Sequence, residues 1–219
     1  MYSPPQSNNI SAAVGKIGDL LDWINARLPG VEVPGDLRHR IPAQLCDLSL
    51  DHAAGIVTLI ASGRHSSGFA LIRCQFECFV RGAWLHYRAT EQEIERFVAN
   101  DEIRLNMTAL IAALEAAPPF EDKLLSNVKE RAWVPMNGYT HGGVHQVSRR
   151  LQGDYIEPVF EDESLLEVLQ FAGTMALIAF GEIAAMADRG DLAAEAQAMM
   201  DAGASLVHPA FSPLTDIEL

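Results

Sequence analysis

Apolar residues recur at helical spacing along most of this chain, and no stretch shows sustained alternation of apolar and polar residues. Alternation is typical of a half-buried strand, because every second side chain of a strand faces the core. With 219 residues, 49% of them hydrophobic, the chain can build one domain with a sizeable core. The sequence therefore predicts an all-α fold, a single helical bundle of seven to nine helices over residues 1–219.

Capping and breaking residues divide this bundle into its expected parts. Residues 1–41 would form an N-terminal helix (about 10–28) and a loop, and residues 189–219 a C-terminal appendage with a short helix and an extended tail after His208. The core, about 42–188, would be an up-down bundle. Its helices are expected to start at Pro42, at Ser66 or Ser67, at the capping box Thr90–Glu93 and at Asp162, and to cover about 42–62, 67–88, 91–98, 101–116, a segment ending near 133, 143–151 and 163–187.

A row of charged side chains crosses the most apolar stretch. Arg73, Glu77 and Arg81 stand four residues apart, which places them on one helical face. Their neighbours are apolar nearly all round, so the helix should be largely buried, and a buried charge is costly unless it is paired. Two guanidinium groups can flank one carboxylate and still have donors to spare. The row indicates either a structural ion network between helices or a pocket for an anion.

Residues 134–145 are the least helix-like stretch of the core, because their three glycines lower helix propensity. The same glycines let the backbone approach a partner closely. The stretch carries Tyr139, a candidate ligand-binding residue, and His141 and His145, which would share one helical face. A zinc site needs more ligands than this pair. We interpret His141 as a general base, as a hydrogen-bonding partner of the arginine row, or as a structural histidine.

Two further histidines are candidates for a site. His52 precedes an apolar run and is expected to face inward, either as a buried, hydrogen-bonded residue or as a ligand-binding one. His86 follows Arg81 by five positions, which is about 140° around an ideal helix. These two residues would therefore share a site only across a helix distortion or a dimer interface.

Cysteine content and charge limit the classes of function. Cys46, Cys74 and Cys78 are expected to be small buried hydrophobes in a reducing cytosol, and neither a metal nor another cofactor is predicted. The net charge of −13 opposes broad binding to nucleic acid or to anionic membranes. The N-terminus lacks a signal-peptide pattern, and the most apolar window, 171–185, is too short and interrupted for a membrane span. We expect a cytoplasmic protein without a membrane partner.

Several motifs together resemble a family of bacterial all-helical proteins of unknown activity. They are His52 with its apolar run, Ser67–Glu77, Arg81–Leu85 and Asn137–Gly143. The architecture and the pattern Arg81-Gly-Ala-Trp-Leu-His86 are also similar, more distantly, to the HEPN (higher eukaryotes and prokaryotes nucleotide-binding) superfamily. Many HEPN members are metal-independent ribonucleases of toxin–antitoxin or phage-defence systems. The resemblance implies an up-down HEPN-like core in which Arg81 holds the scissile phosphate and His86 assists attack by the ribose 2′-hydroxyl. Gly82 stands where those proteins commonly have a polar residue.

Two functions follow as hypotheses. In the first, the bundle cleaves RNA or binds a nucleotide as an effector of a toxin or defence system; Arg81, His86 and His141 are catalytic, and Arg73, Glu77, His52 and Tyr139 bind the ligand. In the second, the protein is a non-catalytic scaffold in a stress or defence operon, and the charged row is purely structural. Apolar faces on several helices favour a homodimer in either case, with a protein from the same operon as a further partner.

Overall fold

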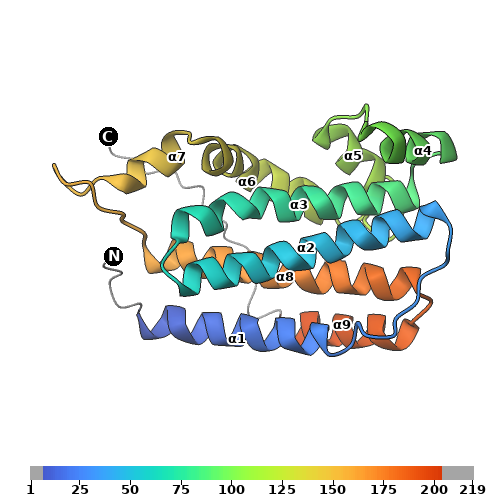
Figure 1. The fold of residues 1–219 in the computed structure, drawn as a ribbon, viewed down its shortest axis with the longest axis horizontal. Coiled ribbons are helices and arrows are strands. Elements are labelled where there is room, and N and C mark those ends of the chain that lie inside the picture. The colour runs from blue at the N-terminus through green and yellow to red at the C-terminus, as the bar shows by residue number, and fades with distance from the viewer. Residues whose placement is uncertain (1–6, 204–219) are drawn as a thin grey trace.

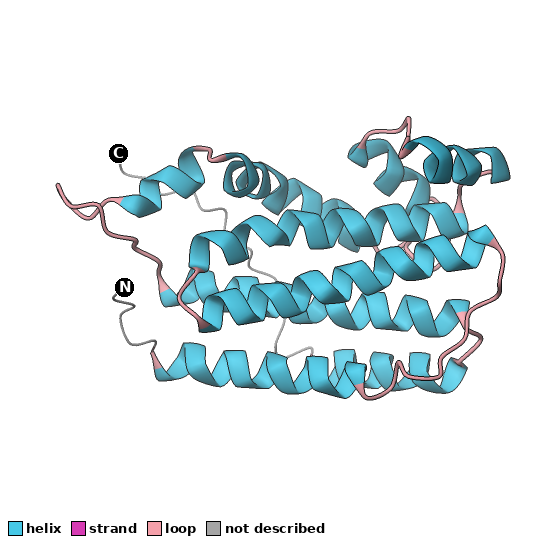
Figure 2. Ribbon diagram, in the orientation of Figure 1, coloured by secondary structure: helices cyan, strands magenta, loops and turns pink. Residues whose placement is uncertain are grey.

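The computed structural model describes residues 7–203, and over that range it consists of nine α-helices and one 3-10 turn, without a strand (Figure 2). The predicted all-α single bundle is therefore confirmed. The helices are α1 (Asn8–Asn25), α2 (Leu37–Ala61), α3 (His65–Tyr87), α4 (Glu91–Asn100), α5 (Met107–Leu114), α6 (Leu124–His141), α7 (Val144–Val147), α8 (Asp162–Met186) and α9 (Gly190–Ala202), with the 3-10 turn η1 (Ser148–Arg150) after α7.

Three long helices form the centre of the bundle. α2, α3 and α8 each pack against the other two. α1 and α9 pack on α8, whereas α5 and α6 pack on α3. α2 runs in the opposite direction to α1, α3 and α8 along the long axis (Figure 1). The N-terminal helix α1 therefore belongs to the core, to which it contributes Ile17, Leu21 and Ile24.

The central position of α8 explains its composition. By length and apolarity alone α8 could cross a membrane, but 67% of its most apolar window is buried inside the bundle. The core helix of a globular protein is apolar all round for the same reason. Its apolar residues include Phe171, Phe180 and Ile183, which join the common core with residues of α2 and α3.

Two helices begin earlier than their sequence signals indicated. α2 starts after Asp36, whose carboxylate accepts a hydrogen bond from the backbone N–H of His39 (3.2 Å), so Pro42 lies inside the helix and not in its first turn. α3 starts at His65 without a side-chain cap, so Ser66 and Ser67 are not caps as expected. α2 thus starts at a local cap of its own, six residues before Pro42, whereas tertiary packing stabilises the start of α3 without a side-chain cap. The capping box at Thr90 is confirmed.

Two other expectations were wrong in the middle of the chain. The helix expected at 101–116 is shorter, because Asn106 caps α5 by accepting a bond from the backbone N–H of Ala109 (3.0 Å) and residues 101–106 form a loop. The stretch expected to be least helical belongs largely to α6, which continues through Pro135 to His141. The tail expected after His208 lies outside the described residues.

Closely packed glycines turn the chain from α6 into α7. The backbone N–H of Gly143 donates to the carbonyl of Gly138 at 2.7 Å, and a Cβ on Gly143 would lie 2.8 Å from the Cα of Gly138. No side chain fits at that distance. The close approach that these glycines allow is made to the chain itself, and an approach to a partner stays a prediction.

Candidate functional site

The charged row of α3 has the arrangement that its spacing predicts. Nε of Arg73 donates to one carboxylate oxygen of Glu77 at 2.6 Å, and Nη2 of Arg81 donates to the other at 3.1 Å. The side chains of Arg73, Glu77 and Arg81 are 22%, 17% and 42% exposed. The row was expected to be buried inside the bundle, but its side chains are only partly buried. Both guanidinium groups therefore remain within reach of a ligand.

A pocket of about 240 Å³ lies beside this row. α3 forms one wall, the end of α4 and the loop 101–106 form another, and α5 and α6 complete it. Its apolar side chains are those of Phe97, Ile103, Leu105, Met107, Leu110 and Trp133. The polar ones are Arg73, Glu77 and Arg81 on α3, with Asp101 and Asn106 on the loop. The pocket combines a cationic wall with an aromatic one.

α6 holds Arg73 in place from the side opposite Glu77. Nη1 of Arg73 lies 2.9 Å from Nε2 of His141, and its guanidinium carbon lies 5.0 Å from the ring centroid of Trp133. Because arginine only donates, Nε2 of His141 must be the acceptor, and the proton of a neutral ring then sits on Nδ1. His141 is exposed. It therefore occupies the place expected of a hydrogen-bonding partner of the arginine row.

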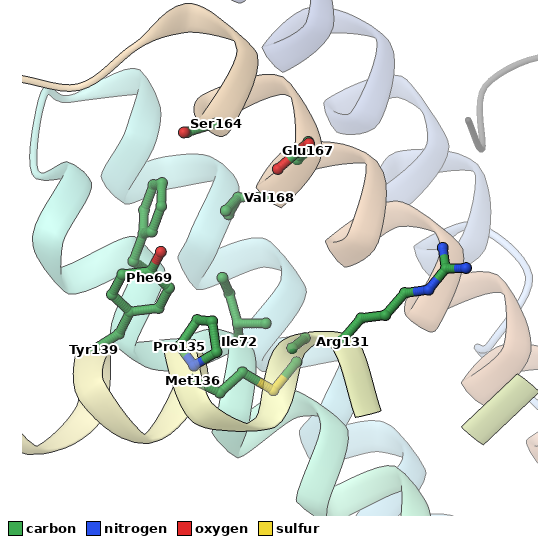
Figure 3. Close-up of a pocket in the computed structure, with 10 residues that line it drawn as sticks. Phe69, Ile72, Arg131, Pro135, Met136, Tyr139, Ser164, Glu167 and Val168 are labelled. Atoms are coloured by element: carbon green, nitrogen blue, oxygen red, sulfur yellow. The ribbon is translucent and has the colours of Figure 1, made fainter. Parts of the chain in front are cut away.

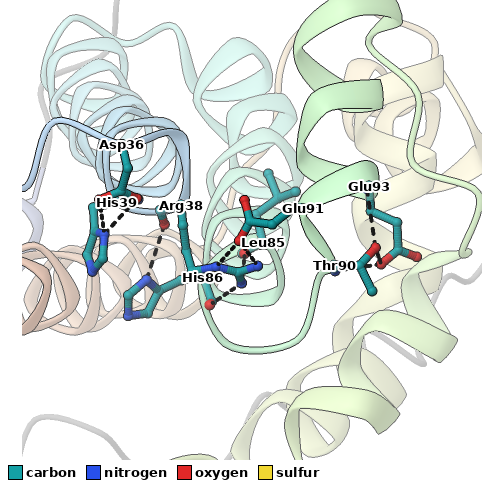
Figure 4. Close-up of polar contacts among 8 residues, drawn as sticks. All are labelled: Asp36, Arg38, His39, Leu85, His86, Thr90, Glu91 and Glu93. Carbon is teal, nitrogen blue, oxygen red and sulfur yellow. Dashed lines mark hydrogen bonds and ion pairs between the residues drawn. The ribbon is translucent and has the colours of Figure 1, made fainter.

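His86 lies beside Arg38 and His39 at the start of α2 (Figure 4). Its Nδ1 is 3.3 Å from the backbone carbonyl of Arg38, and its ring stands edge-to-face against that of His39, with centroids 5.2 Å apart. Burial lowers the pKa of His86, and the bond to the Arg38 carbonyl partly opposes this. Arg81 instead faces the pocket beside α5. α3 is continuous between them, so one protomer does not bring the two side chains to one site.

Arg38 anchors the surroundings of His86. Its guanidinium donates twice to Glu91 (2.6 and 2.9 Å) and to the carbonyls of Leu85 and His86 at the end of α3 (Figure 4). Basic groups stabilise the C-terminus of a helix in this way. These contacts give the region around His86 a structural role.

Tyr139 and His52 also lie away from the row. Tyr139 is buried against Phe69, with ring centroids 5.0 Å apart, and borders a cavity of only about 20 Å³ (Figure 3). Burial raises the pKa of Tyr139 to about 12. His52 is half-buried on α2, where burial lowers its pKa, so it faces the core only in part. Neither residue lines the pocket beside the arginines.

Sequence reasoning missed Trp133, Asp101 and Asn106 as pocket residues. All three border the same pocket as the arginine row but belong to other elements. They are too far from the row in sequence for a local pattern to indicate this. Only Asn106 carried a signal, as an N-cap residue before an apolar run.

Metal ligands and thiols add nothing to this site. Over residues 7–203, no group of three or more His, Cys, Asp or Glu side chains is placed to hold a metal ion. Cys46 is buried as expected, whereas Cys74 and Cys78 are half-buried, and burial raises the pKa of Cys78 to about 11. A thiol of that pKa is a poor nucleophile at neutral pH.

Comparison with known proteins identifies a family without a known activity. Residues 46–208 match the model of a family of unknown function (DUF6988), a match that includes α3, the loop 101–106 and α6. The chain matches no curated protein and no solved structure.

Proposed function

We propose that this chain, which belongs to the family of unknown function DUF6988, binds a single nucleotide-sized ligand through its phosphate group in the pocket beside α3. The observation that carries the proposal is the pairing of two arginines with one carboxylate at an open pocket. Glu77 balances one guanidinium, so the α3 wall keeps one formal positive charge. Arginine is well suited to phosphate because its planar fork can donate two parallel bonds.

The spare donors on the row support an anionic ligand. Among the described residues, no hydrogen bond uses Nη2 of Arg73, or Nε or Nη1 of Arg81. Arg73 is already oriented by Glu77 and His141, so little side-chain entropy would be lost when it binds phosphate. Such preorganisation favours a binding site over a surface ion pair.

Trp133 supports a ligand that carries a ring next to its phosphate. The indole is half-buried, borders the pocket and already contacts the guanidinium of Arg73. Stacking of a nucleobase on an aromatic side chain contributes about 1–3 kcal/mol. Ligand pockets commonly measure about 300–1,000 Å³, so the 240 Å³ here suits one nucleotide better than a length of strand. The net charge of −13 likewise disfavours a long polyanion.

The geometry favours binding over cleavage within one protomer. Cleavage by the pair Arg81 and His86 needs both groups at one phosphate, whereas the contacts of His86 are with Arg38 and His39 on the α2 side of the bundle. His141 is near the row, but its Nε2 is engaged with Arg73. The proposed role is therefore that of a nucleotide-binding effector, and a cleaving form would require a second protomer to supply His86.

Calorimetric titration with the four ribonucleoside monophosphates tests the proposal. We expect the wild-type protein to bind at least one of them and Arg81→Ala to bind about tenfold or more weakly, because a hydrogen bond to a charged group contributes about 1.5–3 kcal/mol. Arg81 is 42% exposed, so its removal should leave the melting temperature nearly unchanged.

Arg64→Ala is the matched control, because Arg64 is exposed and lies outside the pocket. It removes the same charge and should leave binding unchanged. Wild-type protein that binds none of the four nucleotides at millimolar concentration would refute the proposal, and so would Arg81→Ala with wild-type affinity.

A non-catalytic scaffold is the second candidate, and one observation favours it. The contact between Arg73 and His141 joins α3 to α6, as a structural network would. Arg81, however, bonds only to Glu77 on its own helix and makes no tie to another helix among the described residues. The scaffold function therefore gives Arg81 no role, and the Arg81→Ala titration separates the two candidates.

A further inference from the structure

Asp101, an exposed residue at the C-cap of α4, borders the pocket. Its backbone adopts the left-handed conformation (φ 53°), and its N–H bonds to the carbonyl of Phe97 at 2.8 Å. Within residues 7–203, no hydrogen bond or ion pair engages its carboxylate. A carboxylate thus borders the same pocket as two arginines without being paired to either of them.

Positive and negative charge at the pocket therefore come from two different segments of the chain. Arg73, Arg81 and Glu77 together leave one positive charge on α3, and Asp101 leaves one negative charge on the loop wall. An ionised carboxylate is an acceptor only. A ligand that covers Asp101 without offering donors would leave it desolvated and unpaired, which costs affinity. Phosphate alone has no donors to offer at neutral pH beyond a single hydroxyl.

We infer that Asp101 accepts hydrogen bonds from the two vicinal hydroxyls of a ribose, so that the ligand class is the ribonucleotides and not deoxyribonucleotides or free phosphate. This inference rests on the proposed function. A pentose is the group next to the phosphate in every nucleotide, so the sugar enters a pocket of about 240 Å³ whichever base follows. A diol can donate both hydrogens to one carboxylate, as acidic residues of dinucleotide sites do with ribose.

The arrangement also gives the ligand one orientation. Its phosphate would lie against the arginines of α3, its sugar against Asp101, and its base against the indole of Trp133. Each of the three contacts comes from a different segment of the chain. Inorganic phosphate would meet the first contact only, and it would be repelled by Asp101.

Titration of wild-type protein and Asp101→Asn with three probes tests this inference: adenosine monophosphate, its 2′-deoxy analogue and inorganic phosphate. Asparagine tolerates the left-handed backbone of position 101, so the variant should fold normally. For wild type we expect the ribonucleotide to bind about tenfold or more tightly than the deoxynucleotide, because the second hydroxyl is lost. For Asp101→Asn we expect this preference to disappear, mainly through weaker binding of the ribonucleotide.

A matched control variant and a nucleotide with a different base complete the test. Glu102→Gln removes the neighbouring carboxylate, which is paired with Arg104 and does not border the pocket, and should keep the preference for ribose. Uridine monophosphate lacks an exocyclic amine, so a ribose preference that persists for it excludes recognition of an amino group by Asp101.

The outcomes separate this inference from the proposed function. Equal affinity of wild type for the ribo- and deoxynucleotide, with both weakened by Arg81→Ala, would overturn the role of Asp101 and leave nucleotide binding intact. A ribose preference that survives Asp101→Asn would also overturn it. If the wild type binds no nucleotide, both the inference and the proposed function fail.

Discussion

Two half-buried glutamates of this bundle have different hydrogen-bonding partners. Glu77 lies between the guanidinium groups of Arg73 and Arg81, each of which donates a hydrogen bond to one of its carboxylate oxygens. Glu182 on α8 has a single donor, the hydroxyl of Tyr87 at 2.9 Å, and burial raises its pKa to about 7 in spite of that bond. The first carboxylate is paired with two arginines at the border of the pocket, and the second is an ionisable group in the region between α3 and α8.

Glu182 should make stability depend on pH. Its pKa lies near 4.5 in the unfolded chain and near 7 in the folded protein, so the folded state binds more protons between these values. Its stabilising contribution is complete below about pH 4.5 and is lost as the pH rises through about 7. We expect Glu182→Gln to be more stable than wild type by about 1–3 kcal/mol at pH 8 and to lose this advantage toward pH 4.5.

Urea unfolding of wild type and Glu182→Gln across pH 4.5–8 measures this difference. Subtraction of the two curves removes the contribution of other titrating groups, and glutamine still accepts the bond from Tyr87. A difference that is constant with pH would contradict the raised pKa of Glu182.

At the residue scale, the sequence predicted local geometry and missed long-range partners. The bonds of Glu77 follow from side chains four positions apart on one helix, which any α-helix brings together. Asp101 and Trp133 border the same pocket as the row only because the tertiary fold brings the end of α4 and α6 beside it. The separation of Arg81 and His86 was foreseen from the helical angle between them.

Among the elements, α2 and α3 are in close contact where Gly82 faces α2. A Cβ on Gly82 would lie 3.1 Å from the Cβ of Leu45 and 3.2 Å from the backbone carbonyl of Pro42. This close approach explains why glycine stands at position 82. A larger side chain at position 82 would push α2 away from the helix that carries the arginine row.

We expect Gly82→Ala to lower stability, although alanine favours helix by about 1 kcal/mol. Overpacking typically costs about 1–3 kcal/mol, and here the contacts include a backbone carbonyl that cannot rotate away. The net loss should be about 1 kcal/mol, or a melting temperature lower by about 2–4 °C.

Gly15→Ala is the control for this substitution. Gly15 is an exposed residue of α1, and a Cβ there would meet nothing within 4 Å. Its replacement should raise the melting temperature, because only the gain in helix propensity remains. If both variants melt above wild type by differential scanning calorimetry, the close contact at Gly82 does not lower the stability of Gly82→Ala, and the prediction is wrong.

Helix positions followed from periodicity, but several boundaries did not. α2 runs through Pro42 from a cap at Asp36, and α6 runs through Pro135 and Gly138 to His141. Local propensity disfavours helix at these prolines and at Gly138. Packing of α2 on α3 and α8, and of α6 on α3, outweighs that cost.

On the scale of the whole molecule, one core joins the N-terminal helix to the rest. Residues of α1, α2, α3, α6, α8 and α9 belong to a single cluster of buried side chains. We expect one cooperative unfolding transition, since no group of helices has a core of its own. The homodimer, the operon partner and the cytoplasmic location stay predictions.

Tryptophan fluorescence and far-ultraviolet circular dichroism measure this cooperativity. The three tryptophans, Trp23, Trp84 and Trp133, lie in α1, α3 and α6 respectively, so fluorescence reports on both sides of the bundle. The two signals should change at the same urea concentration. An early fluorescence change with circular dichroism largely retained would instead show that an outer helix detaches first.

The central position of α8 has a consequence for biosynthesis. α1 is made early, yet the helix on which it packs is completed only at Met186. At about 5–20 residues per second, translation of the intervening chain takes on the order of 10 s. During that interval α1 can meet α2, on which it also packs, but the part of its apolar stripe that faces α8 has no native partner. We therefore expect the nascent chain to bind chaperones that cover exposed apolar segments until the bundle has folded.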